Sequence, residues 1–405
     1  MAVTLEDIKD AKERISPLLH HTEIDHSSTF SAMTGGSVYL KCENRQKTGS
    51  FKIRGASNKL AILAEQGFKN PVVASSAGNH AQGVAYASSL LGIPATIVMP
   101  MAAPIAKVQA TSRYGAKVVL HGSCYDEAYA KACEICESDN AEFIHPYNDD
   151  AVIAGQGTLG LEIIEDLPDA DVIIVPAGGG GLLAGVALAV KLSGSKAKVY
   201  GVQAEGADAI VRSFETKSYV TTDYSSTIAD GISVRVPGDR TVEIINHYVD
   251  GMVRVSDDDV ANAVLLLLER CKQVVEPAGA TPLAAVLSGR IDIKGKKAVC
   301  LLSGGNIDVS FVQTIIERGL VARHRRIKLE VTLVDRPGSL LELLSVVAEN
   351  GANILKVDHD RIRLDLKPNE IGVHLDCEVS GKEHGDKLIE AVRKTNNSVE
   401  TEDWI

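Results

Sequence analysis

The sequence predicts an α/β fold: a body built on parallel strands, followed by a small ferredoxin-like domain. Between about residues 70 and 305, short apolar runs alternate with helical periods, which is typical of βαβ units and a mainly parallel sheet. Residues 327–405 instead follow the order β-α-β-β-α-β of the ferredoxin-like arrangement. The chain has 35 glycines and only 4% aromatic residues, which favours tight strand-to-helix turns over an all-β sandwich.

The strands expected in the body are short and apolar, and several end in glycine or serine. With the turns that follow them, they lie at 72–78, 95–100, 116–122, 171–181, 198–206 and 297–305. Open α/β sheets bind ligands beyond the carboxyl ends of their strands, so these turns are the expected site. In the C-terminal domain we expect strands at 327–335, 352–362, 371–380 and 398–404, with helices at 337–351 and 385–395.

Length and composition limit the function classes. The 405 residues predict two or three domains. Acidic residues outnumber basic ones by 53 to 42, and this balance argues against nucleic acid or a membrane as the partner. The first thirty residues do not resemble a signal peptide, and the uncharged stretch 172–190 is broken by four glycines, so we expect a strand, a turn and a helix there. Seven scattered cysteines indicate reduced thiols and a cytoplasmic location.

Two motifs in the first hundred residues have the composition of a binding site. The motif TGSFKIRG at 48–55 places Lys52 beside Phe51 in a glycine-bounded loop before a helix. The motif SSAGNHAQG at 75–83 carries a strand into a helix whose first N–H groups suit a carboxylate or phosphate. Taken alone, the first motif favours a solvated surface lysine, and the second is equally a capped helix start.

Two further motifs follow buried strands. Four glycines, Gly178–Gly181, separate an apolar strand from an apolar helix, and such a turn brings several N–H donors to one anion. It lacks the Gly-Lys-Ser/Thr ending of a triphosphate loop, so it favours phosphate binding without ATP hydrolysis. The motif SGGNI begins at Ser303. The spelling GQGTLG at 155–160 fits a dinucleotide fingerprint but follows no clear strand, so a nicotinamide cofactor is not expected.

Together these four motifs resemble those of the fold-type II pyridoxal-phosphate enzymes, and within them the threonine dehydratases that carry a C-terminal ACT domain. The resemblance covers essentially the whole chain. It implies a catalytic body at 1–320 with two parallel-sheet lobes, the smaller inserted at roughly 50–150, a basic linker at 321–326 and an ACT domain at 327–405. It also implies pyridoxal 5′-phosphate as the cofactor.

The resemblance assigns roles residue by residue. Lys52 would hold the cofactor as a Schiff base and, once freed, remove the Cα proton, while Ser303 would face the pyridine nitrogen. The expected cofactor-binding residues are Phe51, Lys52, Asn79, Gly178, Gly179, Gly180, Gly181, Leu182, Glu276 and Ser303. The expected substrate-binding residues are Ser76, Gly78, Asn79 and His80. The implied reaction converts L-threonine to 2-oxobutanoate and ammonia, with L-serine as a slower substrate.

Other activities stay open at this point. An L-serine dehydratase or racemase-like enzyme is one alternative, although the racemases carry a proton-donating serine where this chain has Ala77. A transferase that adds a sulfur nucleophile is another, and a non-enzymatic amino-acid sensor is a third. The racemases also hold a divalent cation with acids at the positions where this chain has Gln203 and Ala209, so no divalent metal is expected here, while a monovalent cation stays open. Glu205 and Asp208 are expected to be solvated.

The C-terminal domain carries the expected regulatory site. The motif DRPGSL at 335–340 resembles the first turn of ACT domains, with Gly338 at the turn and Asn353 opening the next strand. The resemblance implies that these two residues bind an amino-acid effector at an interface between paired domains. Isoleucine as an inhibitor, valine as its opponent, and a homodimer or homotetramer are the expectations.

Overall fold

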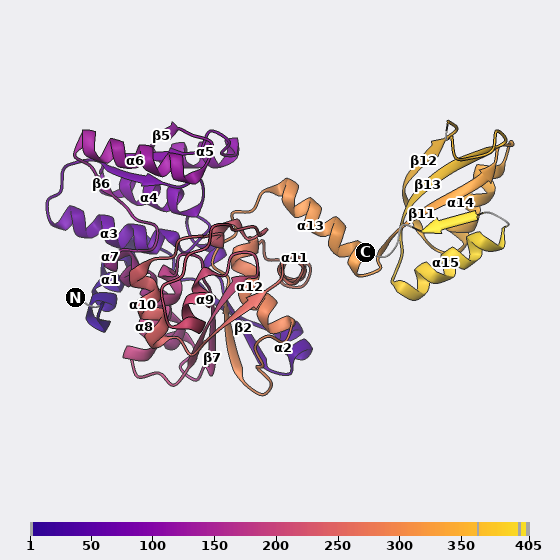
Figure 1. The fold of residues 1–405 in the computed structure, drawn as a ribbon. Helices are drawn as coiled ribbons and strands as arrows, with labels where there is room; N and C mark the ends of the chain where they lie inside the picture. The colour runs from indigo at the N-terminus through magenta and orange to yellow at the C-terminus, as the bar shows by residue number, and fades with distance from the viewer. Residues whose placement is uncertain (1–2, 363, 396–397, 402–405) are drawn as a thin grey trace. The chain divides into compact units, whose positions relative to one another are not determined.

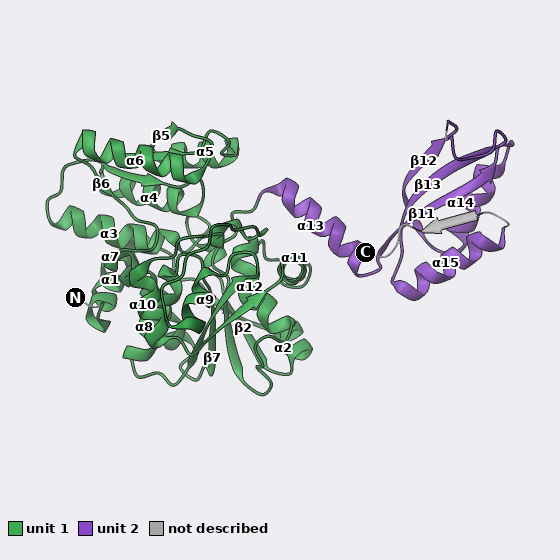
Figure 2. Ribbon diagram, viewed as in Figure 1, with its two compact units in different colours: residues 1–307 green, residues 308–405 purple. Residues whose placement is uncertain are grey.

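The chain divides after Ile307 into two compact units (Figures 1 and 2). The computed structural model describes residues 3–362, 364–395 and 398–401. The first unit holds two separate sheets and the second holds one, so the predicted fold class of an α/β body followed by a βαββαβ domain is confirmed.

The larger sheet of the first unit has six strands in the order β1-β2-β10-β7-β8-β9. The strands are β1 (Ile24–Ser27), β2 (Ser37–Lys41), β7 (Val172–Pro176), β8 (Lys198–Ala204), β9 (Gly251–Val255) and β10 (Lys297–Leu301). All neighbouring pairs are parallel except β1 with β2. At the centre of this sheet, Val299 of β10 is paired with Tyr39 of β2 on one side and with Ile173 of β7 on the other. Strand β7 is buried along its whole length, which explains its uninterrupted apolar sequence.

The smaller sheet has four parallel strands in the order β5-β4-β3-β6. They are β3 (Val72–Ser75), β4 (Ala95–Met99), β5 (Lys117–Leu120) and β6 (Glu142–Phe143). The helices that connect them are α4 (Asn79–Leu91), α5 (Ile105–Arg113) and α6 (Tyr125–Asp139). Cys133 and Cys136 both lie inside α6.

The described part of the first unit, residues 3–307, contains nine further α-helices. They are α1 (Leu5–Ile15), α2 (Ser28–Thr34), α3 (Lys52–Glu65), α7 (Asp150–Asp166), α8 (Gly181–Leu192), α9 (Ala209–Thr216), α10 (Asp239–Tyr248), α11 (Asp257–Leu266) and α12 (Pro277–Leu287). Among the described residues, no helix has the length and apolar character needed to span a bilayer. The uncharged stretch 172–190 is strand β7, a glycine turn and helix α8, as predicted.

Helix α7 contains the GQGTLG spelling and packs between α3 and α8. A Cβ on Gly155 would lie 2.7 Å from the carbonyl oxygen of Arg54 in α3. A Cβ on Gly157 would lie 3.0 Å from the carbonyl oxygen of Gly185 in α8. These glycines therefore serve close helix packing, and the expectation that they form no dinucleotide turn agrees with their place inside a helix.

The second unit begins with helix α13 (Val309–Ala322) and continues as a four-stranded antiparallel sheet with two helices. The strands are β11 (Arg326–Val334), β12 (Asn353–Asp360), β13 (Glu370–Glu378) and β14 (Ser398–Thr401), in the order β12-β13-β11-β14. Helices α14 (Ser339–Glu349) and α15 (Lys382–Lys394) complete the predicted βαββαβ order. Residues 402–404 of the expected last strand lie outside the described residues. The segment expected as a linker, 321–326, spans the end of α13 and the start of β11.

Candidate active site

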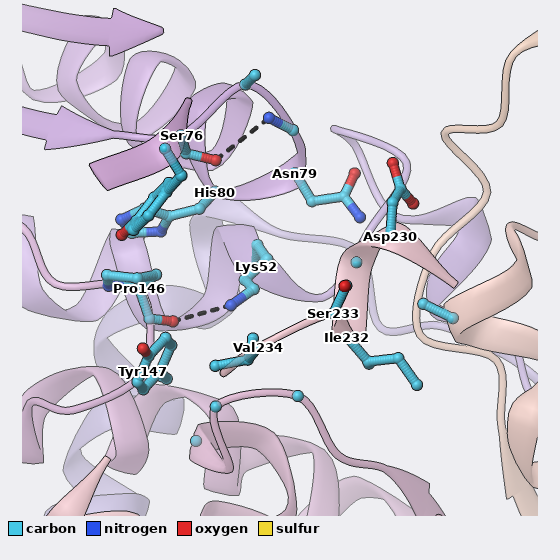
Figure 3. A pocket seen from close by; sticks show the side chains of 18 of the residues that line it. Lys52, Ser76, Asn79, His80, Pro146, Tyr147, Asp230, Ile232, Ser233 and Val234 are labelled. Carbon is cyan, nitrogen blue, oxygen red and sulfur yellow. Dashed lines mark hydrogen bonds between the residues drawn. The ribbon is translucent and has the colours of Figure 1, made fainter. Parts of the chain in front are cut away.

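The four sequence motifs of the first unit meet at one cavity of about 760 Å³ (Figure 3). Every residue predicted to bind cofactor or substrate lines it: Phe51, Lys52, Ser76, Gly78, Asn79, His80, Gly178, Gly179, Gly180, Gly181, Leu182, Glu276 and Ser303. Gly338 and Asn353 belong to the second unit, where both are exposed. The roles assigned to these residues stay predictions.

Lys52 is the first residue of α3 and reaches into this cavity. Its Nζ donates a hydrogen bond to the carbonyl oxygen of Pro146 at 2.9 Å (Figure 3) and lies 5.3 Å from the centre of the Phe51 ring. Burial lowers the pKa of Lys52 to about 8, while the charge of Glu276 acts in the opposite direction. An amine with such a pKa is partly neutral near pH 8 and can act as nucleophile and base.

Asn79 and Glu276 form a hydrogen-bonded pair at the start of α4. The Asn79 side-chain amide donates to both carboxylate oxygens of Glu276, at 2.8 and 3.0 Å. Asn306 donates in turn to Asn79 Oδ1 at 2.7 Å and to the carbonyl of Thr48 at 2.8 Å. Burial raises the pKa of Glu276 to about 7. Asn306 stands in the SGGNI motif, but its link to Asn79 was not predicted.

His80 is a neutral side chain of this cavity. Its Nε2 donates to the carbonyl oxygen of Ile144 at 2.8 Å, because a carbonyl can only accept. Burial, followed by the nearby charge of Lys52, lowers the pKa of His80 to about 3. The imidazole therefore stays uncharged over the whole working range of pH.

The glycine turn before α8 leaves bare backbone at the positive end of a helix. Gly180 has a φ of +97°, and a Cβ there would lie 2.5 Å from the hydroxyl oxygen of Thr241. A Cβ on Gly179 would lie 2.4 Å from the ring of Tyr147, so the turn and this ring are packed without space for a side chain. Free N–H groups at a helix start suit a phosphate, and this cradle fits one.

Ser303 and Ser75 are two of the serines that line the cavity. Ser303 follows β10, is 2% exposed, and accepts a hydrogen bond on its carbonyl from the Phe51 N–H at 3.0 Å. This bond joins the SGGNI and TGSFKIRG motifs directly. Ser75, at the end of β3, has a buried hydroxyl without a hydrogen-bond partner among the described residues. Such an orphaned polar group indicates that a ligand completes the site.

Several cavity residues lie outside the four motifs. Tyr147 donates through its hydroxyl to the carbonyl of Val236 at 2.9 Å. At the rim, Lys107 pairs with Asp230 at 3.2 Å. Sequence reasoning missed this rim because the residues are separated by up to about 120 positions and carry no local motif.

The expectation that Asp208 is solvated is wrong. Its side chain is 9% exposed and bonds to Arg212 at 2.8 Å and to Arg254 at 2.9 Å. Arg254 lies 46 residues further along the chain, so its approach was not legible from the local pattern. Glu205 is exposed. Within the described part of the chain, no group of three or more His, Cys, Asp or Glu side chains is arranged to hold a metal ion.

Comparison with known families identifies the family of the chain that forms this cavity. Residues 15–304 match the family model described as pyridoxal-phosphate dependent enzyme. The chain belongs to this family. Residues 327–397 match the ACT domain model, which confirms the predicted C-terminal domain. Pyridoxal phosphate is therefore the cofactor, and the glycine turn and Lys52 have the phosphate cradle and the amine that it needs.

Individual pyridoxal-phosphate relatives agree with the motif-based resemblance. The chain is 49% identical over 386 residues to the L-threonine ammonia-lyase of Thermotoga maritima, covering 95% of this chain and 96% of that protein. Among solved structures, the processed form of threonine deaminase isoform 2 from Solanum lycopersicum is similar, with a TM-score of 0.74 and 35% identity over 77% of this chain and 86% of that one. Maize serine racemase has a TM-score of 0.74 and 36% identity over 79% of this chain and 98% of that one.

Proposed function

We propose that this protein is an L-threonine ammonia-lyase, which converts L-threonine to 2-oxobutanoate and ammonia and acts more slowly on L-serine. The observation that carries the proposal is that Lys52 and Ala77 line the same cavity. Lys52 is an amine whose pKa burial lowers to about 8, so it can take a proton from Cα. Ala77 has no proton to return, which favours elimination over racemisation.

The residues of the cavity divide the work of binding. The start of α4 offers the N–H groups of Asn79 and His80 to the substrate carboxylate, and neutral His80 adds no competing charge. The glycine turn would hold the cofactor phosphate, and Ser303 would face the pyridine nitrogen. Bound pyridoxal phosphate supplies the electron sink that accepts the electrons of the Cα–H bond.

Proton movement then falls to Lys52. Its Nζ takes the Cα proton and is the source of the proton with which the β-hydroxyl leaves as water. The unsaturated amine product takes up one water after release and gives the 2-oxo acid and ammonia, so water is lost once and regained once. The side chains of Ser303 and His80 are neutral and add no fixed positive charge of their own to this part of the site.

A direct assay tests the proposal. Purified full-length protein with bound pyridoxal phosphate is mixed with L-threonine, and 2-oxobutanoate is measured. We expect steady product formation from the wild type and a loss of at least about 1000-fold in Lys52→Ala, in which the nucleophile and base are both gone. An absence of product from cofactor-loaded wild type would refute the proposal.

The racemase alternative is tested at Ala77. L-Serine is supplied, and both pyruvate and D-serine are measured. We expect pyruvate with little D-serine from the wild type, and a larger share of D-serine from Ala77→Ser, which adds a proton donor. A wild type that already makes mainly D-serine would favour the racemase.

For regulation we propose that isoleucine binds the ACT domain at the turn holding Gly338 and at Asn353, and that it inhibits by favouring a less active state. Valine opposes it, in a cytoplasmic homodimer or homotetramer. Asn353→Ala should weaken isoleucine binding at least about 10-fold by calorimetry, as expected for one lost side-chain contact in an effector site. Equal affinity in both proteins would contradict this assignment.

A further inference from the structure

His145 lies beside the active site, outside the four motifs, in the turn that follows β6. Its Nδ1 accepts hydrogen bonds from the backbone N–H groups of Tyr147 at 3.2 Å and Asn148 at 2.8 Å. Backbone N–H groups can only donate, so Nδ1 carries no proton and the neutral ring has its proton on Nε2. The His145 ring also meets the Tyr147 ring edge-on, with centroids 4.7 Å apart. The side chain therefore holds residues 145–148 in one fixed turn.

This turn contacts the active site at two points. The carbonyl oxygen of Pro146 accepts the hydrogen bond from Lys52 Nζ at 2.9 Å (Figure 3). The ring of Tyr147 covers the glycine turn so closely that a Cβ on Gly179 would lie 2.4 Å from it, and a Cβ on Gly181 would lie 2.9 Å from the Tyr147 Cβ. One short segment thus contacts both the reactive amine and the expected phosphate cradle.

The same turn is also fixed from its far side. The Asn148 side-chain amide donates to Asp239 at 2.8 Å, and its oxygen accepts from the Arg240 N–H at 3.2 Å. Tyr147 is bonded through its hydroxyl to Val236. These bonds attach Tyr147 and Asn148 to residues 236–240, whereas the two bonds to His145 lie within the turn itself.

We propose that His145 is a positioning residue: its unprotonated Nδ1 fixes the 145–148 turn, and the turn sets the Lys52 amine and the glycine cradle at the separation that pyridoxal phosphate requires. The contact between Lys52 and Pro146 describes the free amine, which is the form that must meet the cofactor. Burial, followed by the charge of Lys52, lowers the pKa of His145 to about 4, so the acceptor persists at neutral pH.

Two substitutions of His145 distinguish the role of its hydrogen-bond acceptor, Nδ1, from the role of the size of its ring. In His145→Asn the amide oxygen can take the place of Nδ1 and accept the same two N–H groups. In His145→Gln the polar atoms lie one bond further out, near the place of Nε2, and the N–H groups lose their acceptor. A matched control exists in the second unit, where His384 Nδ1 accepts the Ser380 N–H at 3.0 Å.

The readout is the affinity of the full-length chain for pyridoxal phosphate, with the cofactor removed and titrated back while its absorbance is followed. We expect His145→Gln to raise the dissociation constant by about 10-fold or more, as losing an orienting partner does at cofactor sites. His145→Asn should stay within about 3-fold of the wild type, and His384→Gln should match the wild type. The measurement needs no substrate, so its outcome is separate from that of the proposed lyase activity.

Two results would overturn the proposal: a Gln variant that binds the cofactor as tightly as the wild type, or an Asn variant that loses as much affinity as the Gln variant. Thermal unfolding of each cofactor-free protein reports whether the fold is retained. If the Gln variant does not fold, the Asn variant still decides, because a 10-fold loss of affinity in a folded Asn variant contradicts the acceptor role.

Discussion

The Asn79 side chain donates hydrogen bonds to both carboxylate oxygens of Glu276, across 197 residues of sequence. Asn79 opens α4 beside the small sheet, and Glu276 precedes α12 beside the large one. The pair therefore ties the two lobes together at the cavity. Since burial raises the pKa of Glu276 to about 7, this tie includes a carboxyl group that titrates near neutral pH.

Replacing this carboxyl group should change how stability depends on pH. The pKa of Glu276 rises from 4.5 to about 7 on folding, so between these values the folded chain holds a proton that the unfolded chain has released. Its contribution to stability is therefore full below pH 4.5 and falls as pH rises to about 7. From pH 5 to 8, the wild type should lose about 2 kcal/mol more than Glu276→Gln in urea unfolding of the cofactor-free protein. Glu205→Gln, at an exposed carboxylate, should keep the wild-type slope, and equal slopes in Glu276→Gln would contradict the prediction.

The reactivity of Lys52 should titrate at an unusually low pH. The neutral amine is the nucleophile, and burial lowers the pKa of Lys52 to about 8. The rate at which the cofactor-free chain captures pyridoxal phosphate should therefore rise with pH with a midpoint near 8. Glu276→Gln should move the midpoint lower, because the carboxylate charge stabilises the ammonium. Stopped-flow absorbance measures the rate, with Lys52→Ala as the background, and a wild-type midpoint above about 9.5, close to an ordinary lysine, would be inconsistent with the site described.

Gly180 of the phosphate cradle should not tolerate a side chain, because a close contact and a positive φ coincide there. Gly180→Ala places a Cβ 2.5 Å from the hydroxyl oxygen of buried Thr241, at a φ of +97°. We expect a loss of about 1–3 kcal/mol in the free energy of unfolding and at least about 10-fold in affinity for pyridoxal phosphate. Gly194 has a φ of +79°, and a Cβ there would meet no atom within 4 Å. Gly194→Ala should therefore cost only backbone strain and leave the affinity for pyridoxal phosphate unchanged. If Gly180→Ala and Gly194→Ala lost the same affinity, the specific role of the phosphate cradle would be ruled out.

Arg54 holds a buried ion cluster two residues beyond Lys52. Its guanidinium bonds to Glu43 at 2.8 Å and to Glu162 at 2.6 Å, and the residue is 1% exposed. Arg54→Met should destabilise the protein by about 3–5 kcal/mol, because buried Glu43 loses its cation and Glu162 keeps only Lys41, at 2.9 Å. Arg45 pairs with Glu23 at 2.9 Å in the open, and Arg45→Met should cost less than about 1 kcal/mol. Urea unfolding compares the two, and similar costs would show that burial of the cluster contributes little.

The features of this site that the sequence predicts are those formed by residues close together in the chain. Lys52, the SSAGNHAQG turn and the four glycines can each be recognised within ten residues, because a helix start or a glycine turn is a local structure. The link from Asn306 to Asn79, the orienting role we propose for His145 and the burial of Asp208 depend on residues brought together from distant parts of the chain. No local pattern records such contacts, so these features needed the fold.

The same distinction explains why the two sheets were easier to predict than the cavity rim. Parallel strands are recognisable as short apolar runs, and their carboxyl ends must meet at one edge. The bond between Lys107 and Asp230 joins two side chains that no local motif marks. Either residue would fit a solvated surface, and only their approach across the cavity makes them part of its rim.

Helix α7 separates the two elements that are expected to grip the cofactor. It packs through Gly155 against α3, which begins at Lys52, and through Gly157 against α8, which begins at the phosphate cradle. Among the described residues that line the cavity, none belongs to α7. Helix α7 therefore lies between the two elements, and its thickness, together with the 145–148 turn, determines the distance between Lys52 and the phosphate cradle. A single methyl group added at Gly157 would push α7 and α8 apart and so change how the cofactor is held, although Gly157 does not line the cavity.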